Sequence, residues 1–204
     1  AQYKDFEPDM AVCNSGDIRF NPEIHPDGIY PARLNVDTAT IFEIFPWETG
    51  ELSLVEITGA ELYSTFERSV AALPPASTSY NGCFLQVSKE IKVEYDLSQQ
   101  AQIIDKTNPD NPFIATEGQR VVSLKINDVA VDSAQSYKMV VPLWLLEGGD
   151  DYLVLKDIAA QKKQLLENIP ALPMTMEREA LIYYLLKYQT INPSLEGRIG
   201  FTSK

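Results

Sequence analysis

Histidine and cysteine are scarce in this sequence, and their scarcity excludes several kinds of catalytic and structural site. The single histidine, His25, lies in a proline-rich stretch, where we expect a surface loop. Hydrolytic centres with zinc or two metal ions draw on several histidine and carboxylate ligands, so the chain is not a self-contained metallohydrolase. Two cysteines, Cys13 and Cys83, are too few for a disulfide scaffold and too far apart in sequence for a zinc knuckle. They form one disulfide or remain as two buried thiols.

Long apolar runs and basic residues are also lacking. No stretch of about 18 apolar residues occurs, so the sequence predicts no membrane span. The 17 basic residues are outnumbered by 29 acidic ones, and the formal net charge is −12. Such a surface repels nucleic acids and anionic lipids, and the basic stripe of a nucleic-acid-binding protein is missing. If the ligand is an anion, a few local arginines have to hold it against the overall charge.

What remains is the composition of an ordinary globular domain. The chain has 204 residues, of which 45% are hydrophobic and 23% are charged, a size that allows a substantial core. Runs typical of β-strands lie at residues 10–13, 52–57, 84–87, 91–95, 121–126 and 137–146. Asn127-Asp128 predicts a hairpin turn.

Helical spacing marks three other segments, at residues 38–45, 60–73 and 175–188. Asp37-Thr38 and Thr175 are the expected caps of the first and the last. The expected inward stripe of the last helix consists of Ala180, Leu181, Tyr184, Leu185 and Tyr188. Strands and helices together predict an α/β or α+β domain, with a mixed β-sheet flanked by helices.

Four separated segments carry glycine-rich or aromatic signatures. They are CNSGDIR at 13–19, GCFLQVS at 82–88, WLLEGGDDY at 144–152 and INPSLEGRI at 191–199. In order and spacing the first three resemble the Asn-x-Gly-Gly-Ile-Arg, Gly-x-Phe-Leu-Gln-Val-Ser and aromatic-Leu-Ala-x-Gly-Gly-Asp-Gly-Phe/Tyr segments of 5′-nucleotidases. The fourth is similar to the ending of the ecto-5′-nucleotidase branch. One such motif is weak evidence, whereas four in register are specific.

The resemblance implies that residues 1–204 form the carboxy-terminal, substrate-binding domain of a metal-dependent phosphohydrolase that acts on nucleotides. In that family an amino-terminal metallophosphatase domain, with Asp-x-His and Asn-His-Glu motifs, holds two divalent, zinc-like ions. Neither motif is present in these residues, and we expect the chain to lack the opening helix of the carboxy-terminal domain. We therefore expect a chain that binds no cofactor, is inactive alone and works with that other domain. The family further implies an extracellular, cell-surface or periplasmic protein.

The resemblance assigns five side chains and three glycines to a nucleotide site. Phe84 and Trp144 would clamp the base between two aromatic faces, and Asp150 would accept the hydrogens of the ribose diol. Arg19 would hold phosphate oxygens as a bidentate fork, and Asn14 would donate from its amide. The backbone would approach the ligand closely at three glycines, Gly16, Gly148 and Gly149.

Without the flanking motifs, these residues have plainer interpretations. A phenylalanine in a β-type run and a tryptophan near a strand end are more often core residues, and Gly-Gly-Asp is more often a tight turn. Three departures from the family pattern also bear on the site. Asp17 replaces a glycine next to the expected phosphate contact, where it would repel a phosphate or bend the turn. Asp151 and Lys89 replace two further glycines.

The resemblance leads to one further structural expectation and leaves two functional alternatives. If Asn14 and Phe84 line one pocket, Cys13 and Cys83 lie beside it on neighbouring backbone, which predicts a disulfide in an oxidising compartment. The first alternative is a stand-alone, non-catalytic binding or structural domain that kept the fold and lost the activity, which Asp17, Asp151 and the missing metal domain favour. The second is a subunit of a larger assembly, such as a homodimer, because carboxy-terminal domains of the family can mediate dimer contacts.

Overall fold

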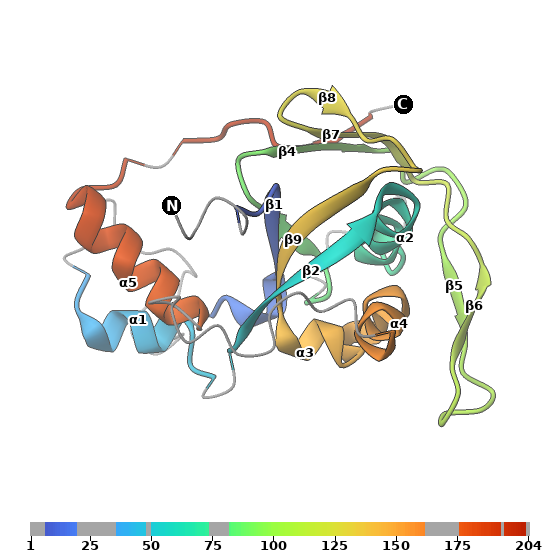
Figure 1. Cartoon of the computed structure of the whole chain (residues 1–204), viewed down its shortest axis with the longest axis horizontal. Coiled ribbons are helices and arrows are strands. Elements are labelled where there is room, and N and C mark those ends of the chain that lie inside the picture. Colours follow the sequence, from blue (N-terminus) through green and yellow to red (C-terminus); the bar gives the residue numbers. More distant parts are fainter. Residues whose placement is uncertain are drawn as a thin grey trace.

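The structure is a computed structural model that describes residues 7–19, 36–47, 50–73, 82–161, 176–192 and 194–202. Within these ranges the β-structure consists of two four-stranded sheets and a two-stranded hairpin. The hairpin, β5 (Ile103–Asp105) and β6 (Phe113–Thr116), extends as an arm beside the rest of the chain (Figure 1). The mixture of mixed sheets and helices confirms the predicted fold class. His25 and the expected cap Thr175 lie outside the described residues.

The first sheet brings several distant segments to one end. Its order is β2 (Leu52–Thr58), β9 (Ser136–Pro142), β1 (Met10–Asn14) and β3 (Leu85–Val87). β1 runs parallel to β9 and antiparallel to β3, and β2 runs antiparallel to β9. This topology places four chain positions at the same end of the sheet: those after Asn14 and Pro142 and those before Leu52 and Leu85.

The second sheet closes the other side of the core. Its order is β10 (Ile199–Phe201), β4 (Ile91–Tyr95), β7 (Val121–Ile126) and β8 (Val129–Ala130). β10 pairs with β4 in parallel, whereas β7 is antiparallel to both of its neighbours. The turn between β7 and β8 confirms the predicted hairpin, since Asn127 and Asp128 have left-handed φ angles of 50° and 65°.

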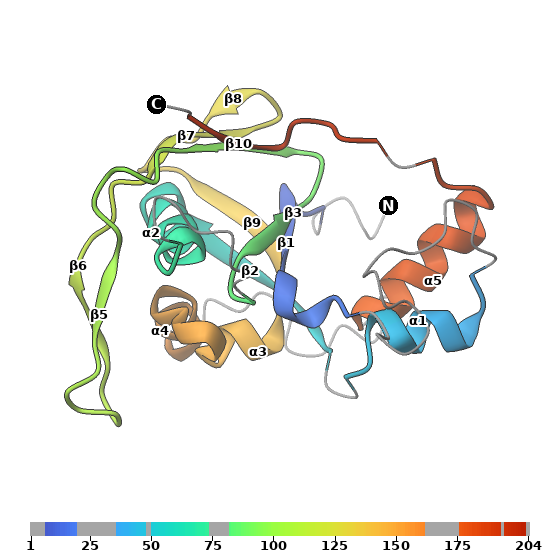
Figure 2. The same ribbon diagram turned by 180° about the vertical axis from the view of Figure 1, so that it is seen from behind.

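Helices lie on two sides of the first sheet (Figures 1 and 2). They are α1 (Thr38–Ile44), α2 (Gly59–Val70), α3 (Leu143–Leu146), α4 (Leu153–Ala160) and α5 (Glu177–Tyr188), with the 3-10 turns η2 (Ser15–Asp17) and η3 (Gly149–Asp151). α2 and α4 contact each other and β2, whereas α1 contacts α5 on the other side. The predicted cap Asp37 is confirmed, because its side chain accepts from Thr40 N at 2.8 Å.

One hydrophobic core joins both sheets to the helices. Its largest fully buried side chains include Ile57 of β2, Phe66 of α2, Tyr95 of β4 and Leu145 of α3. The apolar side of α2 faces this core, and a capping box between Thr58 and Glu61 starts the helix. No helix in the described ranges is long and apolar enough to cross a membrane.

Two expectations about the helices are wrong. The strand predicted over 137–146 ends at Pro142, and the next four residues form α3, since a continuous apolar run does not by itself separate strand from buried helix. The expected inward stripe of α5 also fails at Tyr184 and Tyr188, which are 48% and 51% exposed. Their ring centroids lie 4.6 Å apart at the surface.

Candidate functional site

A pocket lies at the end of the first sheet, and the turn after β1 forms its first wall. Ser15 N donates to the carbonyl oxygen of Phe84 at 2.7 Å, and Gly16 N donates to that of Gly82 at 2.8 Å. These bonds continue the β1–β3 pairing beyond the strands. A Cβ atom at Gly16 would lie 3.2 Å from the Gly82 oxygen, so the close approach of the two backbones favours glycine at this position.

The second wall is built by α3 and η3. The Trp144 ring covers the backbone of Gly149, where a Cβ atom would lie 2.5 Å from ring atom Cε2. Gly148 has a φ of 93°, and Asp150 and Asp151 follow with φ of 51° and 62°. This left-handed turn redirects the chain and brings Asp150 to the pocket. Gly148 and Gly149 therefore shape the turn that carries Trp144 and Asp150.

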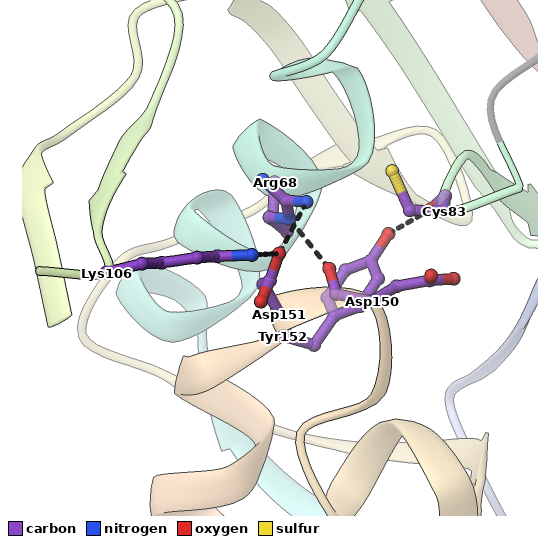
Figure 3. Close-up of polar contacts among 6 residues, drawn as sticks. All are labelled: Arg68, Cys83, Lys106, Asp150, Asp151 and Tyr152. Carbon is purple, nitrogen blue, oxygen red and sulfur yellow. Dashed lines mark hydrogen bonds and ion pairs between the residues drawn. The ribbon is translucent and has the colours of Figure 1, made fainter. Parts of the chain in front are cut away.

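Figure 3 shows how the η3 turn is held in place. Arg68 of α2 donates from Nε to the carbonyl oxygen of Asp150 at 2.8 Å and from Nη2 to Asp151 Oδ2 at 3.2 Å. Lys106, beside the β5–β6 arm, donates to the same Asp151 oxygen at 2.6 Å. The two carboxylates point in different directions, with that of Asp151 toward the two cations. Asp151, which replaces a glycine of the family pattern, thus adds no carboxylate to the pocket lining.

A buried tyrosine connects the two walls. The hydroxyl of Tyr152, directly after η3, donates to the carbonyl oxygen of Cys83, directly before Phe84 (Figure 3). Tyr152 is 1% exposed and Cys83 is 4% exposed, so water does not compete for this bond. The relative position of the Gly82 and Asp150 segments is therefore fixed by the core.

The pocket between the walls has a volume of about 350 Å³. It is lined by Asn14, Gly16, Asp17, Arg19, Trp47, Gly50, Gly82, Pro142, Trp144, Asp150 and Glu177. Five of the predicted site residues meet here: Asn14, Gly16, Arg19, Trp144 and Asp150. Asn14 Nδ2 donates to Asp150 Oδ2 at 3.4 Å across the two walls. Because Asn14 is only 2% exposed, its amide position is fixed by the surrounding protein.

The structure places Phe84 outside the lining of this pocket. Its ring stacks on Phe201 of β10, with centroids 6.4 Å apart and an interplanar angle of 24°, and contacts Tyr95 at 6.4 Å. Phe84 packs against the hydrophobic core as a partly buried side chain. An aromatic clamp between Phe84 and Trp144 is therefore not formed by the residues that line the pocket in this structure.

Among the pocket residues that sequence reasoning did not select, Trp47 and Glu177 carry an aromatic ring and a carboxylate. Trp47 follows α1, and the guanidinium carbon of Arg19 lies 5.2 Å from its ring centroid. Residues 44–47, with the sequence IFPW, weakly resemble a Leu-Pro-Phe segment of 5′-nucleotidases, and this resemblance is a signal that could have found Trp47. Glu177 begins α5, and its N–H donates to the carbonyl oxygen of Gly50 at 2.9 Å. No local motif marks it, because this contact joins distant parts of the sequence.

The pocket is acidic. Burial raises the pKa of Asp17 and, together with the charge of Asp150, outweighs the opposing effects of Asn14 and Arg19. Burial likewise raises the pKa of Asp150, against the effects of Arg68 and Asn14. The pKa of Glu177 rises to about 7, chiefly through burial and with a contribution from the charge of Asp17.

A thiol and two carboxylates meet beside the pocket. Cys13 Sγ donates to Glu177 Oε1 at 3.1 Å, and one ligand atom each of Cys13, Asp17 and Glu177 lies within 4.8 Å of the others. Burial, followed by the charge of Glu177, raises the pKa of Cys13 strongly. The thiol therefore keeps its proton at neutral pH, and we assign no metal site to this group.

The structure does not form the disulfide expected between Cys13 and Cys83. Cys13 lies opposite Gln86 in the β1–β3 register, and its Sγ contacts Glu177. Cys83 instead belongs to the hydrophobic core, together with Val12. Successive residues of a strand point to opposite faces, so Cys13 points away from the face on which Val12 and Cys83 are buried.

Replacing Glu177 with glutamine should change how stability depends on pH. The pKa of Glu177 rises from 4.5 to about 7 on folding, so in this window the folded chain holds a proton that the unfolded chain has released. Wild-type stability therefore falls as pH rises through this window. The difference in free energy of unfolding between E177Q and wild type should therefore shift in favour of E177Q by on the order of 2 kcal/mol from pH 5 to pH 8.

Urea denaturation of both proteins at the two pH values measures this difference. Glu147→Gln is the matched control, since Glu147 is exposed at the end of α3 and does not line the pocket. A difference between E177Q and wild type that is the same at pH 5 and pH 8 would contradict the prediction.

The sequence is similar to proteins of one family. The family model for the 5′-nucleotidase C-terminal domain matches residues 1–157 of this sequence. The chain is 27% identical over 202 residues to 5′-nucleotidase from Bos taurus, and 29% identical over 203 residues to snake venom 5′-nucleotidase from Macrovipera lebetinus. These matches cover 95% and 94% of this chain but 29% and 40% of the relatives. The chain thus spans less than half the length of either relative.

Solved structures share the fold. The 5′-nucleotidase precursor from Thermus thermophilus matches with a TM-score of 0.73 and 21% identity, covering 100% of this chain and 33% of that protein. The NAD nucleotidase NadN from Haemophilus influenzae matches with a TM-score of 0.65 and 18% identity, covering 97% of this chain and 30% of that protein. At these identities the likeness concerns the fold, and it confirms the predicted fold type.

Proposed function

The chain belongs to the 5′-nucleotidase family as a carboxy-terminal domain, and from this we propose that it binds the nucleoside part of a nucleotide that the full-length enzyme hydrolyses. One observation carries the proposal. An exposed aromatic face, a carboxylate and an amide converge on a single pocket, in the form of Trp144, Asp150 and Asn14. A nucleoside offers a matching base, diol and set of hydrogen-bond donors.

Each of these side chains has a role that suits one part of a nucleoside. Trp144 is 43% exposed and offers a ring face on which a base can stack. Asp150 accepts hydrogen bonds from the ribose hydroxyls, and Asn14 orients its carboxylate from 3.4 Å. Arg19, exposed beside Trp47, offers a guanidinium to an anionic substituent at the rim.

We place the hydrolytic step outside this chain. Among the described residues, Cys13, Asp17 and Glu177 form the one group of three side chains able to hold a metal ion. A single protonated thiol with two carboxylates does not fit a two-metal hydrolytic centre. We infer that two zinc-like ions belong to an amino-terminal metallophosphatase domain, to which this domain presents the substrate. The venom origin of some relatives supports an extracellular location.

Calorimetric titration with adenosine tests the proposal. Base–aromatic stacking is worth roughly 1–3 kcal/mol, so Trp144→Ala should weaken adenosine binding roughly 5- to 150-fold. Asp150→Asn should weaken it as well, because the amide replaces one acceptor oxygen with a donor. Phe113→Ala is the control, since Phe113 is 53% exposed on β6, outside the pocket.

Two results would count against this function. If adenosine binds W144A and D150N as well as it binds wild type, the ligand occupies a different surface. A folded wild-type chain that binds neither adenosine nor AMP would instead support the non-catalytic alternative, a domain that kept the fold and lost the activity.

A further inference from the structure

Hydrogen-bond acceptors dominate among the described residues that line the pocket. Three carboxylates, Asp17, Asp150 and Glu177, stand against the single guanidinium of Arg19. Glu177 is only 7% exposed, so its charge is poorly screened by solvent. Arg19 is exposed and stacked beside Trp47. The positive charge is therefore at the rim and the negative charges are deeper in the protein.

The orientation of the Asn14 amide decides what this residue adds to the pocket. Asn14 Oδ1 is buried and has no hydrogen-bond donor within the described part of the chain. The same amide already uses Nδ2 to donate to Asp150, and its hydrogen bond with Asp17 favours that carboxylate in its charged form. Flipping the amide would set its oxygen against carboxylate oxygens, so its orientation is fixed. The amide therefore presents its donor to the carboxylate of Asp150 and adds no positive charge to the pocket.

A phosphate group has the opposite properties. It carries close to two negative charges at neutral pH and offers acceptor oxygens, and in this pocket it would meet the buried carboxylate of Glu177 and the partly buried carboxylates of Asp17 and Asp150, which repel it. Asp17 lies two residues before Arg19, and the guanidinium opposes its raised pKa. Arg19, the only cation among the described residues that line the pocket, is thus partly neutralised by Asp17.

We propose that Asp17 and Glu177 make this pocket select uncharged nucleosides over nucleotides that carry a terminal phosphate. The proposal rests on the proposed function, because it specifies which form of the ligand the same site prefers. Asp17 acts beside Arg19, and Glu177 acts as a buried lining residue at the start of α5. The full-length enzyme would then retain the substrate through its nucleoside part and release a dephosphorylated nucleoside slowly.

The selection should depend on pH through Glu177. The described titratable groups facing this carboxylate are Cys13 of β1 and Asp17 of η2, and Arg19 and Asp150 line the same pocket. Because the pKa of Glu177 lies at about 7, acidification from pH 8 to pH 6 removes most of its charge. Binding of AMP relative to adenosine should therefore improve at pH 6.

Calorimetry with adenosine and AMP, in buffer containing EDTA, tests the proposal. At pH 8 wild type should bind adenosine at least about tenfold more tightly than AMP, and Asp17→Asn and Glu177→Gln should each reduce this ratio several-fold. Glu147→Gln removes an exposed carboxylate outside the lining and should leave the ratio unchanged. The phosphate of AMP also titrates near pH 6, and this makes the affinity ratio depend on pH in every variant. The test is therefore how much of the pH dependence of the ratio seen in wild type is lost in E177Q.

The possible failures can be told apart. If wild type binds neither ligand although it is folded, the proposed function itself fails. If wild type binds adenosine and AMP equally, or if D17N and E177Q leave their ratio unchanged, the nucleoside function stands and the charge selection is wrong. Circular dichroism of each variant shows that it is folded before its ratio is compared.

Discussion

Replacing Gly149 with alanine should weaken adenosine binding roughly 5- to 150-fold while the domain remains folded. A Cβ atom at this position would lie 2.5 Å from Cε2 and 2.6 Å from Cε3 of Trp144. Neither ring nor backbone can yield by a small adjustment at these distances, so the indole has to move. Trp144 is 43% exposed, and it can therefore swing outward without disrupting the core. The ring face that stacks on the base would be lost.

Calorimetry gives the change in affinity, and tryptophan fluorescence reports the new environment of the indole. Gly200→Ala is the matched control, because a Cβ atom there would lie 3.5 Å from a flexible Glu94 side chain. G200A should change neither the affinity for adenosine nor the tryptophan fluorescence. If G149A bound adenosine with wild-type affinity, Trp144 would have no stacking role in the pocket, and the proposed function would lose one of its three supports.

Features that depend on a few adjacent residues were predictable from the sequence. The Asp37 cap, the Asn127-Asp128 turn and the α2 helix all form where local signals place them. In each case the decisive hydrogen bonds or backbone angles involve residues no more than a few positions apart. The end of β9 was less predictable, because Leu143 to Leu146 are as apolar as a buried strand and only their packing makes them a helix.

The pocket itself depends on contacts between distant segments. The motifs selected Asn14, Arg19, Trp144 and Asp150, and the parallel pairing of β1 with β9 brings their segments together. The sequence contained no sign that Glu177 would join them, since it reaches the pocket through a hydrogen bond from its backbone N–H to the Gly50 carbonyl. Periodicity along one segment carries no information about such a contact.

Asp17 and Asp151 show why the effect of a departure from a motif has to be judged from the structure. Both replace a glycine of the family pattern, and the sequence alone gives them the same weight. Asp151 faces Arg68 and Lys106 and lies outside the pocket lining, whereas Asp17 is part of that lining. One substitution is therefore balanced by cations from α2 and from the residue after β5. The other changes the charge that a ligand meets.

Replacing Arg68 with methionine should also weaken adenosine binding, roughly 10- to 150-fold, although Arg68 does not line the pocket. Its side chain is 16% exposed and donates to both the Asp150 carbonyl and the Asp151 carboxylate. Hydrogen bonds of charged groups contribute about 1.5–3 kcal/mol each. Without them the left-handed Asp150–Asp151 turn loses its support from α2, and the Asp150 carboxylate is no longer held toward Asn14.

Lys106→Met provides the control that separates positioning from simple loss of charge. Lys106 pairs with the same Asp151 oxygen, but its side chain is 57% exposed, and such surface pairs contribute only about 0–1 kcal/mol. K106M should therefore lower affinity less than roughly fivefold. Arg68→Lys should recover part of the loss in R68M, because an ammonium can pair with Asp151 but cannot reproduce the fork that also reaches the Asp150 carbonyl. Equal losses in R68M and K106M, at unchanged thermal stability, would show that charge near Asp151 matters and that the bond to the Asp150 backbone does not.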